Sequence, residues 1–338
     1  MGKTKNTAVR VYRGAQLDYL AFPLGGIGAG MLCLDGNGAF SHVSLCNTPA
    51  LNSEPLMFAA LGFPDGRTPA RLLAGPQPKH KIMRDGAHRT HGLRCCRRAQ
   101  FAARFPFGTV TLSEPALPLR VRITGWSPFV PNDADHSSLP VAALEYTFRN
   151  PTRKRITAVF SFHAENFLAQ QRTPRTDTVR PIAGGFIVQE TGTDQAPWEQ
   201  AAFSVSTDHP DAVVDCAWFR GGWFDALTMV WQQIERGAAS AHPPHAAGAP
   251  GTGASIYAPI SLAAGATTTI VVRLAWHAPV TNLRIGQDTA ATSTPAALPA
   301  SPRLPPTGAT STRRCAPPRS NSPIAFTTRR CRRRCSMR

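Results

Sequence analysis

The chain has 338 residues, of which 42% are hydrophobic and only 17% charged, with 31 Pro and 27 Gly. This length favours about two domains, and the frequent Pro and Gly exclude a coiled coil or a helical bundle along the whole chain. No apolar stretch reaches the ~18 residues that a membrane span needs. The basic, polar start is not followed by an apolar run, so the sequence predicts a cytoplasmic protein without a secretory signal.

The net charge of +17 is unevenly distributed along the chain. Residues 282–338 hold 11 Arg, no Lys and one acid, a net charge of +10, whereas residues 1–281 hold 26 basic and 19 acidic residues, a net charge of +7. The long first part is therefore only mildly basic, and the charge of the whole chain does not by itself indicate nucleic-acid binding.

Alternating apolar and polar residues predict β-strands at four places, because successive side chains of a strand point to opposite faces. These places are 120–123, 141–149, 154–163 and 269–276. The turn residues Asn150 to Arg153 predict that the second and third strands form an antiparallel hairpin. Recurrent Gly, Pro and Asn between such strands favour an all-β fold, an antiparallel β-sandwich with a short helix, over a parallel α/β sheet.

One helix is predicted from Asp225 to Glu235, with Asp225 capping its start and Gly237 ending it. Its apolar residues recur at helical spacing and are Phe224, Leu227, Trp231 and Ile234. Residues 237–254 are then expected to form a loop before the last strand. Periodicity ends near residue 285. The expected organisation is an N-terminal extension (1–19), a β-sandwich domain (20–285) and a disordered tail rich in Arg, Pro and Cys (286–338).

A glycine-rich run, Gly25-Gly26-Ile27-Gly28-Ala29-Gly30, has the composition of a nucleotide-binding loop without its spacing. Met31 and Cys33 stand where the third Gly of the dinucleotide fingerprint would fall, and no Lys-Ser or Lys-Thr follows. The favoured interpretation is a tight turn in which backbone closely approaches backbone. Phosphate binding is the alternative.

The most polar loop, 131–138, contains Asp133, Asp135 and His136. Paired carboxylates can carry acid/base chemistry or bind a cation. Asp and Ser also cap turns by accepting hydrogen bonds from nearby backbone. We favour the structural interpretation of this loop.

Cysteine, histidine and tryptophan give no specific motif. The eight Cys contain no CxxC pair and are expected to be reduced and inert, with a lowered thiol pKa at Cys95 and Cys96 as the alternative. No His pair has metal-ligand spacing, so no metal or cofactor is expected. His163 is interpreted as a core or edge histidine. Most of the six Trp are expected to pack in the core, with sugar stacking as the alternative.

Five segments, taken together, resemble one family. They are 22–30, 104–108, 125–131, 138–142 and 274–276, which read FPLGGIGAG, RFPFG, GWSPFVP, SLPVA and LAW. In this order and spacing, about residues 20–285 resemble the N-terminal domain of the bile acid β-glucosidase, or non-lysosomal glucosylceramidase, family (glycoside hydrolase family 116).

The resemblance implies a β-sandwich packed on a C-terminal (α/α)₆ helical domain, in enzymes that hydrolyse β-glucosides, glucosylceramide included, with retention of configuration. In that family a Glu nucleophile and an Asp acid/base in the helical domain carry the chemistry. No residue of this chain matches them, so no catalytic residue is assigned and the chain alone is expected to be inactive. Its implied partner is the helical domain, with a β-glucoside or glycolipid substrate only in the intact enzyme, and no nucleic acid is expected.

Two segments, the Gly25–Gly30 turn and the 126–138 loop, are expected to meet the helical domain or to border its pocket. The candidate residues are Gly25, Gly26, Gly28, Gly30, Trp126, Asp133, Asp135 and His136. An exposed contact face predicts aggregation when the helical domain is missing. Two other classes stay open. One is a stand-alone carbohydrate-binding β-sandwich, which would lose glycan binding on Trp126→Ala, and the other is a nucleic-acid-binding protein acting through its basic tail.

The composition of the tail suggests a frameshift. Its Arg, Cys and Pro bias is what a GC-rich gene gives when it is read out of frame. One choice of codons for Phe326 to Arg338, read two bases later, encodes Tyr-Asp-Thr-Thr-Leu-Pro-Pro-Gln-Val-Leu-Asp-Ala, which resembles the entry into the helical domain of the family. The hypothesis is a frameshift soon after Asp288.

Overall fold

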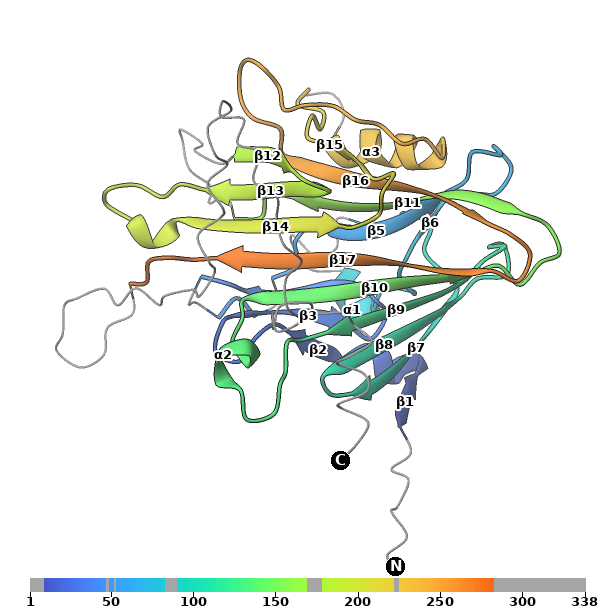
Figure 1. Ribbon diagram of the computed structural model, residues 1–338, viewed down its shortest axis with the longest axis horizontal. Coiled ribbons are helices and arrows are strands. Elements are labelled where there is room, and N and C mark those ends of the chain that lie inside the picture. Colours follow the sequence, from blue (N-terminus) through green and yellow to red (C-terminus); the bar gives the residue numbers. More distant parts are fainter. Residues whose placement is uncertain are drawn as a thin grey trace, which may run out of the picture. The chain divides into compact units, whose positions relative to one another are not determined.

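The computed structural model describes residues 9–46, 49–51, 53–82, 90–168, 178–221 and 225–282, all within one compact unit. Three antiparallel β-sheets make up most of this part, as Figure 1 shows. The all-β prediction is therefore confirmed. The predicted disordered tail, 286–338, lies outside the described residues.

The largest sheet has nine strands, the second has five and the third has three. In spatial order the nine are β1 (Arg10–Arg13), β7 (Arg98–Arg104), β8 (Phe107–Ser113), β9 (Arg120–Trp126), β10 (Val141–Arg149), β17 (Thr267–His277), β14 (Ala201–Thr207), β13 (Gly185–Glu190) and β12 (Thr178–Ile182). The five are β15 (Val213–Asp215), β16 (Gly253–Leu262), β11 (Ile156–Glu165), β5 (Met57–Gly62) and β6 (Arg71–Leu72). The three are β2 (Ala21–Leu24), β3 (Met31–Asp35) and β4 (Phe40–Ser44).

The two smaller sheets pack on the same face of the nine-stranded sheet. Tyr146 of β10 is the cross-strand partner of Ile123 of β9, and residues directly opposite each other share a face. The Tyr146 ring lies 4.8 Å from the Phe160 ring of the five-stranded sheet. Further along the same face of β9, a Cβ at Gly125 would lie 2.9 Å from Leu24 of the three-stranded sheet. One hydrophobic core thus joins all three sheets.

The predicted hairpin between residues 141–149 and 154–163 is wrong. β10 pairs with β9 and β17, whereas β11 pairs with β16 and β5, so the two strands belong to different sheets. The turn between them crosses from one layer to the other. Asn150 is fully buried there and donates from Nδ2 to the carbonyl oxygens of Lys154 (2.7 Å), Leu262 (3.1 Å) and Ala263 (3.0 Å). The turn residues were read correctly, but they do not specify which strands pair.

The predicted helix is confirmed as α3 (Ala226–Glu235). The Asp225 carboxylate accepts from Thr228 N at 2.7 Å, and Gly237 follows the helix with φ +58°, a conformation that favours glycine. Trp231 and Ile234 pack on the outer side of β5. The predicted Phe224 lies outside the described residues. The other helical turns are short: η1 (Gly14–Leu17), α1 (Lys79–Ile82), α2 (Ala134–Ser137) and η2 (Pro197–Glu199).

The loop expected over 237–254 ends earlier, because Gly253 already begins β16, a strand before the last one that the sequence did not reveal. Nearly all of its residues are buried, on both faces: Ile256 and Ala258 belong to the main core, while Ser255 on the other face accepts a hydrogen bond from Trp218. A strand buried on both faces has no polar alternation to detect.

Candidate functional site

The Gly25–Gly30 turn joins β2 to β3 and is close-packed, as predicted. A Cβ at Gly26 would lie 2.2 Å from the carbonyl oxygen of Leu139, and a Cβ at Gly25 would lie 2.7 Å from that of Gly30. Gly25, Gly28 and Gly30 also have positive φ angles of +136°, +73° and +88°. Gly25 and Gly30 combine both features, which only glycine allows without strain, so close backbone contact accounts for this composition.

The turn and the 126–138 loop, which the sequence singled out separately, lie side by side. Gly25 N donates to Ser127 Oγ at 3.1 Å, and Ile27 N donates to the carbonyl oxygen of Ser137 at 2.8 Å. Trp276 at the end of β17 contacts this turn, and its Nε1 donates to the carbonyl oxygen of Ala29 at 2.6 Å. In Figure 1 this loop carries α2 at the lower left of the nine-stranded sheet.

Within this loop, Asp133 and His136 form a local cap. The Asp133 carboxylate accepts from His136 N at 3.0 Å, and its other oxygen lies 2.7 Å from His136 Nδ1. The backbone hydrogen bond from His136 lowers the pKa of Asp133, and the ring contact adds to this effect. A carboxyl group with a lowered pKa is a poor general acid. Asp135 lies exposed one residue from the start of α2. The arrangement agrees with the structural interpretation of this loop.

Two exposed apolar side chains flank these segments. Ile27 at the tip of the turn is 62% exposed, and Phe105 is 60% exposed with its ring edge-on to Phe129 at 4.9 Å. Trp126 lies half-buried at the end of β9, opposite Phe107 and Ala143. We call residues 25–30, Phe105 and residues 126–138 the loop face. It gathers all eight candidate residues at one end of the sandwich.

His163 is a satisfied core histidine, as predicted. Its side chain is fully buried, with Nδ1 2.7 Å from Ser255 Oγ and Nε2 2.8 Å from Ser161 Oγ. Trp218 Nε1 donates to the same Ser255 hydroxyl at 2.8 Å. Burial lowers the pKa of His163 to about 3, so the ring stays neutral. Without access to solvent it stabilises the core and performs no surface chemistry.

The described cysteines are free thiols. Burial raises the pKa of Cys96 to about 12, and the pKa of Cys95 is raised as well. The alternative of a lowered thiol pKa at this pair is therefore wrong, because desolvation outweighs the neighbouring arginine charge. Cys315, Cys331 and Cys335 lie outside the described residues.

Three of the tryptophans, Trp218, Trp231 and Trp276, are core residues, as expected. Trp198 differs, because it is 36% exposed and lines a pocket of about 350 Å³ that the sequence did not indicate. Its neighbours in that pocket come from segments far apart in the chain, so no local pattern announces it. Trp223 lies outside the described residues.

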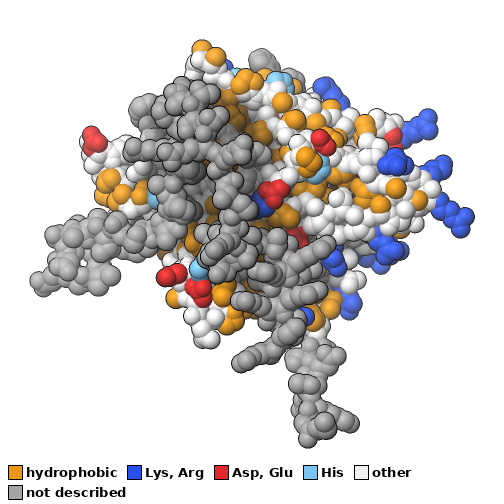
Figure 2. Space-filling view, viewed as in Figure 1, with side chains coloured by type: hydrophobic (Ala, Val, Ile, Leu, Met, Phe, Trp, Pro, Cys, Tyr) orange, Lys and Arg blue, Asp and Glu red, His pale blue; other side chains and the backbone are white. Residues whose placement is uncertain are grey.

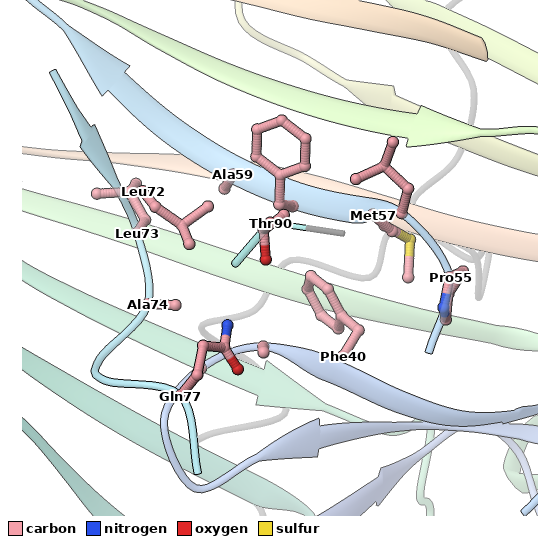
Figure 3. Close-up of a pocket in the computed structure, with 13 residues that line it drawn as sticks. Phe40, Pro55, Met57, Ala59, Leu72, Leu73, Ala74, Gln77 and Thr90 are labelled. Carbon is pink, nitrogen blue, oxygen red and sulfur yellow. The ribbon is translucent and has the colours of Figure 1, made fainter. Parts of the chain in front are cut away.

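A second cavity, shown in Figure 3, has a volume of only about 20 Å³. Phe40, Met57 and Gln77 point into it from different segments. That volume suffices for about one water molecule, so this cavity is a packing gap between sheets and not a ligand site.

Over the described ranges, no group of three or more His, Cys, Asp and Glu side chains has a geometry that could hold a metal ion. In the same part of the chain, no helix combines the length and the apolar character needed to cross a membrane.

Comparison with known proteins identifies the class of this sandwich. A family model described as beta-glucosidase 2, glycosyl-hydrolase family 116 N-term, matches residues 21–295. The chain contains the N-terminal domain of a glycoside hydrolase. It belongs to glycoside hydrolase family 116, as the five segments had indicated. None of the curated proteins matches the chain.

Two solved structures align with most of this chain at low similarity. One is described as a kojibiose phosphorylase from the human microbiome, with 6% identity and a TM-score of 0.31, and another as a family GH92 α-mannosidase from Bacteroides thetaiotaomicron, with 10% identity and a TM-score of 0.32. The alignments cover 79% and 77% of this chain but only 25% and 32% of those proteins. The chain thus spans about a quarter to a third of their length.

Proposed function

We propose that this chain is the non-catalytic N-terminal half of a retaining β-glucosidase or glucosylceramidase that works in the cytoplasm. The family match over residues 21–295 carries the proposal. In this reading the catalytic Glu and Asp belong to a helical domain that the chain does not itself provide, and no cofactor is required. The substrate is a β-glucoside or glucosylated lipid, bound only by the assembled enzyme.

The loop face is the surface that we assign to contact with the helical domain. Its backbone is fixed by glycine contacts and by Ser127, so it presents a rigid shape to a partner. Ile27 and Phe105 supply exposed apolar area, which is unfavourable in water and favourable at an interface. The Asp133–His136 pair lies partly exposed on the same face and adds polar groups to it.

The chain alone is expected to lack glycosidase activity. Retaining glycosidases need two carboxyl groups about 5 Å apart, one as nucleophile and one as acid/base. Asp133 is committed to capping α2 with its backbone and ring contacts to His136, and it cannot supply the acid.

The decisive test is the nucleotide sequence from codon 280 onward, translated in all three frames. We expect a second frame to continue into a long helical region bearing Glu and Asp, and the protein that joins residues 1–288 to that frame to hydrolyse 4-nitrophenyl β-glucoside. The chain as it stands serves as the inactive control. If no frame continues in this way, or if the chain alone is active, the proposal is wrong.

A second test addresses the loop face. Phe105→Glu should abolish association between residues 1–288 and a separately produced helical domain, because it places a charge in an apolar contact. Met229→Glu, which places the same charge at an apolar residue of α3 that is 38% exposed, against 60% for Phe105, should leave association intact. Equal effects of both variants would remove the assignment of the loop face.

A further inference from the structure

The pocket lined by Trp198 has the size and lining of a small-ligand site. Its volume of about 350 Å³ falls within the range of about 300–1,000 Å³ typical of ligand pockets. Leu45, Phe167 and Trp198 form apolar walls, while Ser53, Glu199 and Asn282 add a hydroxyl, a carboxylate and an amide. Apolar walls with a few polar groups are the usual composition of such sites.

Trp198 is held in place although its ring is exposed. It lies in η2, where Pro197 fixes the first helical residue and Gln200 N donates to the carbonyl oxygen of Pro197 at 3.1 Å. The preceding turn is closed by Ala196 N, which donates to Thr193 Oγ1 at 3.1 Å. A large aromatic ring on a rigid turn that stays 36% exposed costs hydrophobic free energy unless something stacks on it.

Two other lining residues, Phe167 and Leu45, are also held in place. The Phe167 ring packs edge-on against Phe203 of β14 at 5.0 Å, so it is tied to the core of the nine-stranded sheet. Leu45 follows β4, and its Cα would lie 3.2 Å from a Cβ at Gly30. The pocket therefore adjoins the glycine turn of the loop face, which the family match places in a glycoside hydrolase.

We propose that this pocket binds one pyranose unit of a glycan, with the sugar ring stacked on Trp198. A pyranose has an apolar face of C–H groups, which matches an aromatic wall, and a rim of hydroxyls. Glu199 can accept hydrogen bonds from those hydroxyls, while Ser53 and Asn282 can both donate and accept. That the sugar is a β-glucoside rests on the proposed function, whereas binding of a pyranose does not.

The test is isothermal titration of the full chain with methyl β-glucoside and with cellobiose. We expect saturable binding with a Kd near the millimolar range. Trp198→Ala should weaken it at least tenfold, while Trp198→Phe, which keeps an apolar ring, should stay within a few-fold of the wild type. Met229→Ala is the matched control, because Met229 is 38% exposed and does not line the pocket.

The intrinsic fluorescence of tryptophan gives an independent readout. Addition of cellobiose should change the emission of the wild-type chain and should leave the emission of Trp198→Phe unchanged, with circular dichroism confirming that both are folded. The proposal is overturned if the wild type shows no saturable binding, if Trp198→Ala binds like the wild type, or if binding is lost only on Trp126→Ala. The reading-frame test decides the proposed function separately.

Discussion

The two ends of the sandwich are built in different ways. At the loop face, backbone packs against backbone, as where Gly26 meets Leu139, and the large apolar side chains of Ile27 and Phe105 remain exposed. The opposite end carries cations, and Figure 2 shows Lys and Arg side chains gathered along the right-hand edge, away from α2. We call Arg120, Arg149, Arg153, Lys154 and Arg155 the basic end. There the side chain of Asn150, with the Thr152 hydroxyl donating to it, holds the turn that crosses between the sheets.

This difference indicates that solubility accounts for the residues of the basic end but not for those of the loop face. The basic end brings two like charges together, because Arg120 and Arg149 are cross-strand partners, and water is their best environment. Within the described residues none of its five cations forms an ion pair. At the loop face, by contrast, the turn leaves no room for a Cβ at Gly25, Gly26 or Gly30. Ile27 and Phe105 are exposed there. A partner domain of matching apolar surface would cover that end and leave the other solvated.

The largest effect is expected from Gly26→Ala at the loop face. Its Cβ would meet the backbone of Leu139 at 2.2 Å, and backbone cannot move aside as a flexible side chain can. The free energy of unfolding should fall by more than about 3 kcal/mol, measured by urea denaturation. Gly28→Ala is the matched control, because its Cβ points into open space and only the positive φ is costly, about 1 kcal/mol. Equal losses would show that close approach does not build this face.

At the basic end, Asn150→Ala should cost about 2 to 3 kcal/mol. The change removes the donor that Asn150 Nδ2 provides to the carbonyl oxygen of Leu262 at a buried position. Arg153→Ala in the same turn should stay within about 0.5 kcal/mol of the wild type in the same urea assay. A small effect of Asn150→Ala would mean that the crossover is held by the strands alone.

The buried His163 side chain should make the free energy of unfolding depend on pH. His163 has a pKa of about 3 in the folded state and about 6.5 when unfolded. Below pH 6.5 the imidazole therefore becomes protonated in the unfolded chain but stays neutral in the native state. Stability should therefore fall with falling pH, by about 2 kcal/mol between neutrality and pH 5.

The comparison that isolates His163 is the difference in unfolding free energy between wild type and His163→Gln at pH 7, 6 and 5. The variant should be less stable at pH 7, because the Ser161 and Ser255 contacts are disturbed, but its stability should depend less on pH. Parallel pH profiles would show that the slope comes from other groups.

The smallest effect is a gain at the basic end. Arg149→Glu replaces a like-charge pair with Arg120 by an attractive one and should raise the unfolding free energy by about 0.5 kcal/mol at low salt. The gain should vanish in 1 M salt, where charges are screened within about 3 Å. Arg153→Glu, which lies in the turn without a cross-strand partner, is the control. A loss of stability on Arg149→Glu would mean that the arginine has an unrecognised favourable contact.

Local patterns predicted the strands at 120–123, 141–149, 154–163 and 269–276 and the helix, because each depends on a short stretch of sequence. Asp225 and Gly237 mark the ends of α3 through contacts within a few residues, and the sequence contains all that is needed. Strand pairing depends on distant residues instead. The 141–149 and 154–163 strands alternate as expected, yet their partners lie far away in the sequence, as where Val141 pairs with Ala275 and Ile156 with Leu262, which no local turn can specify.

The candidate site was predictable only in part, for the same reason. The glycine spacing indicated close backbone approach, and the structure identifies the approaching segment as residues 138 and 139. The Trp198 pocket had no sequence signal, because Leu45, Phe167 and Trp198 come from three separate segments. Whether the eight candidate residues meet a helical domain stays a prediction.

The reactivity of the buried thiols reports local unfolding of this domain. Each sheet has one near it: Cys33 in β3, Cys96 just before β7 and Cys216 just after β15. Because burial holds their pKa values at about 11, 12 and 12, they react with a thiol reagent only when their layer opens. The order in which the three become labelled would therefore show which layer of the sandwich separates first.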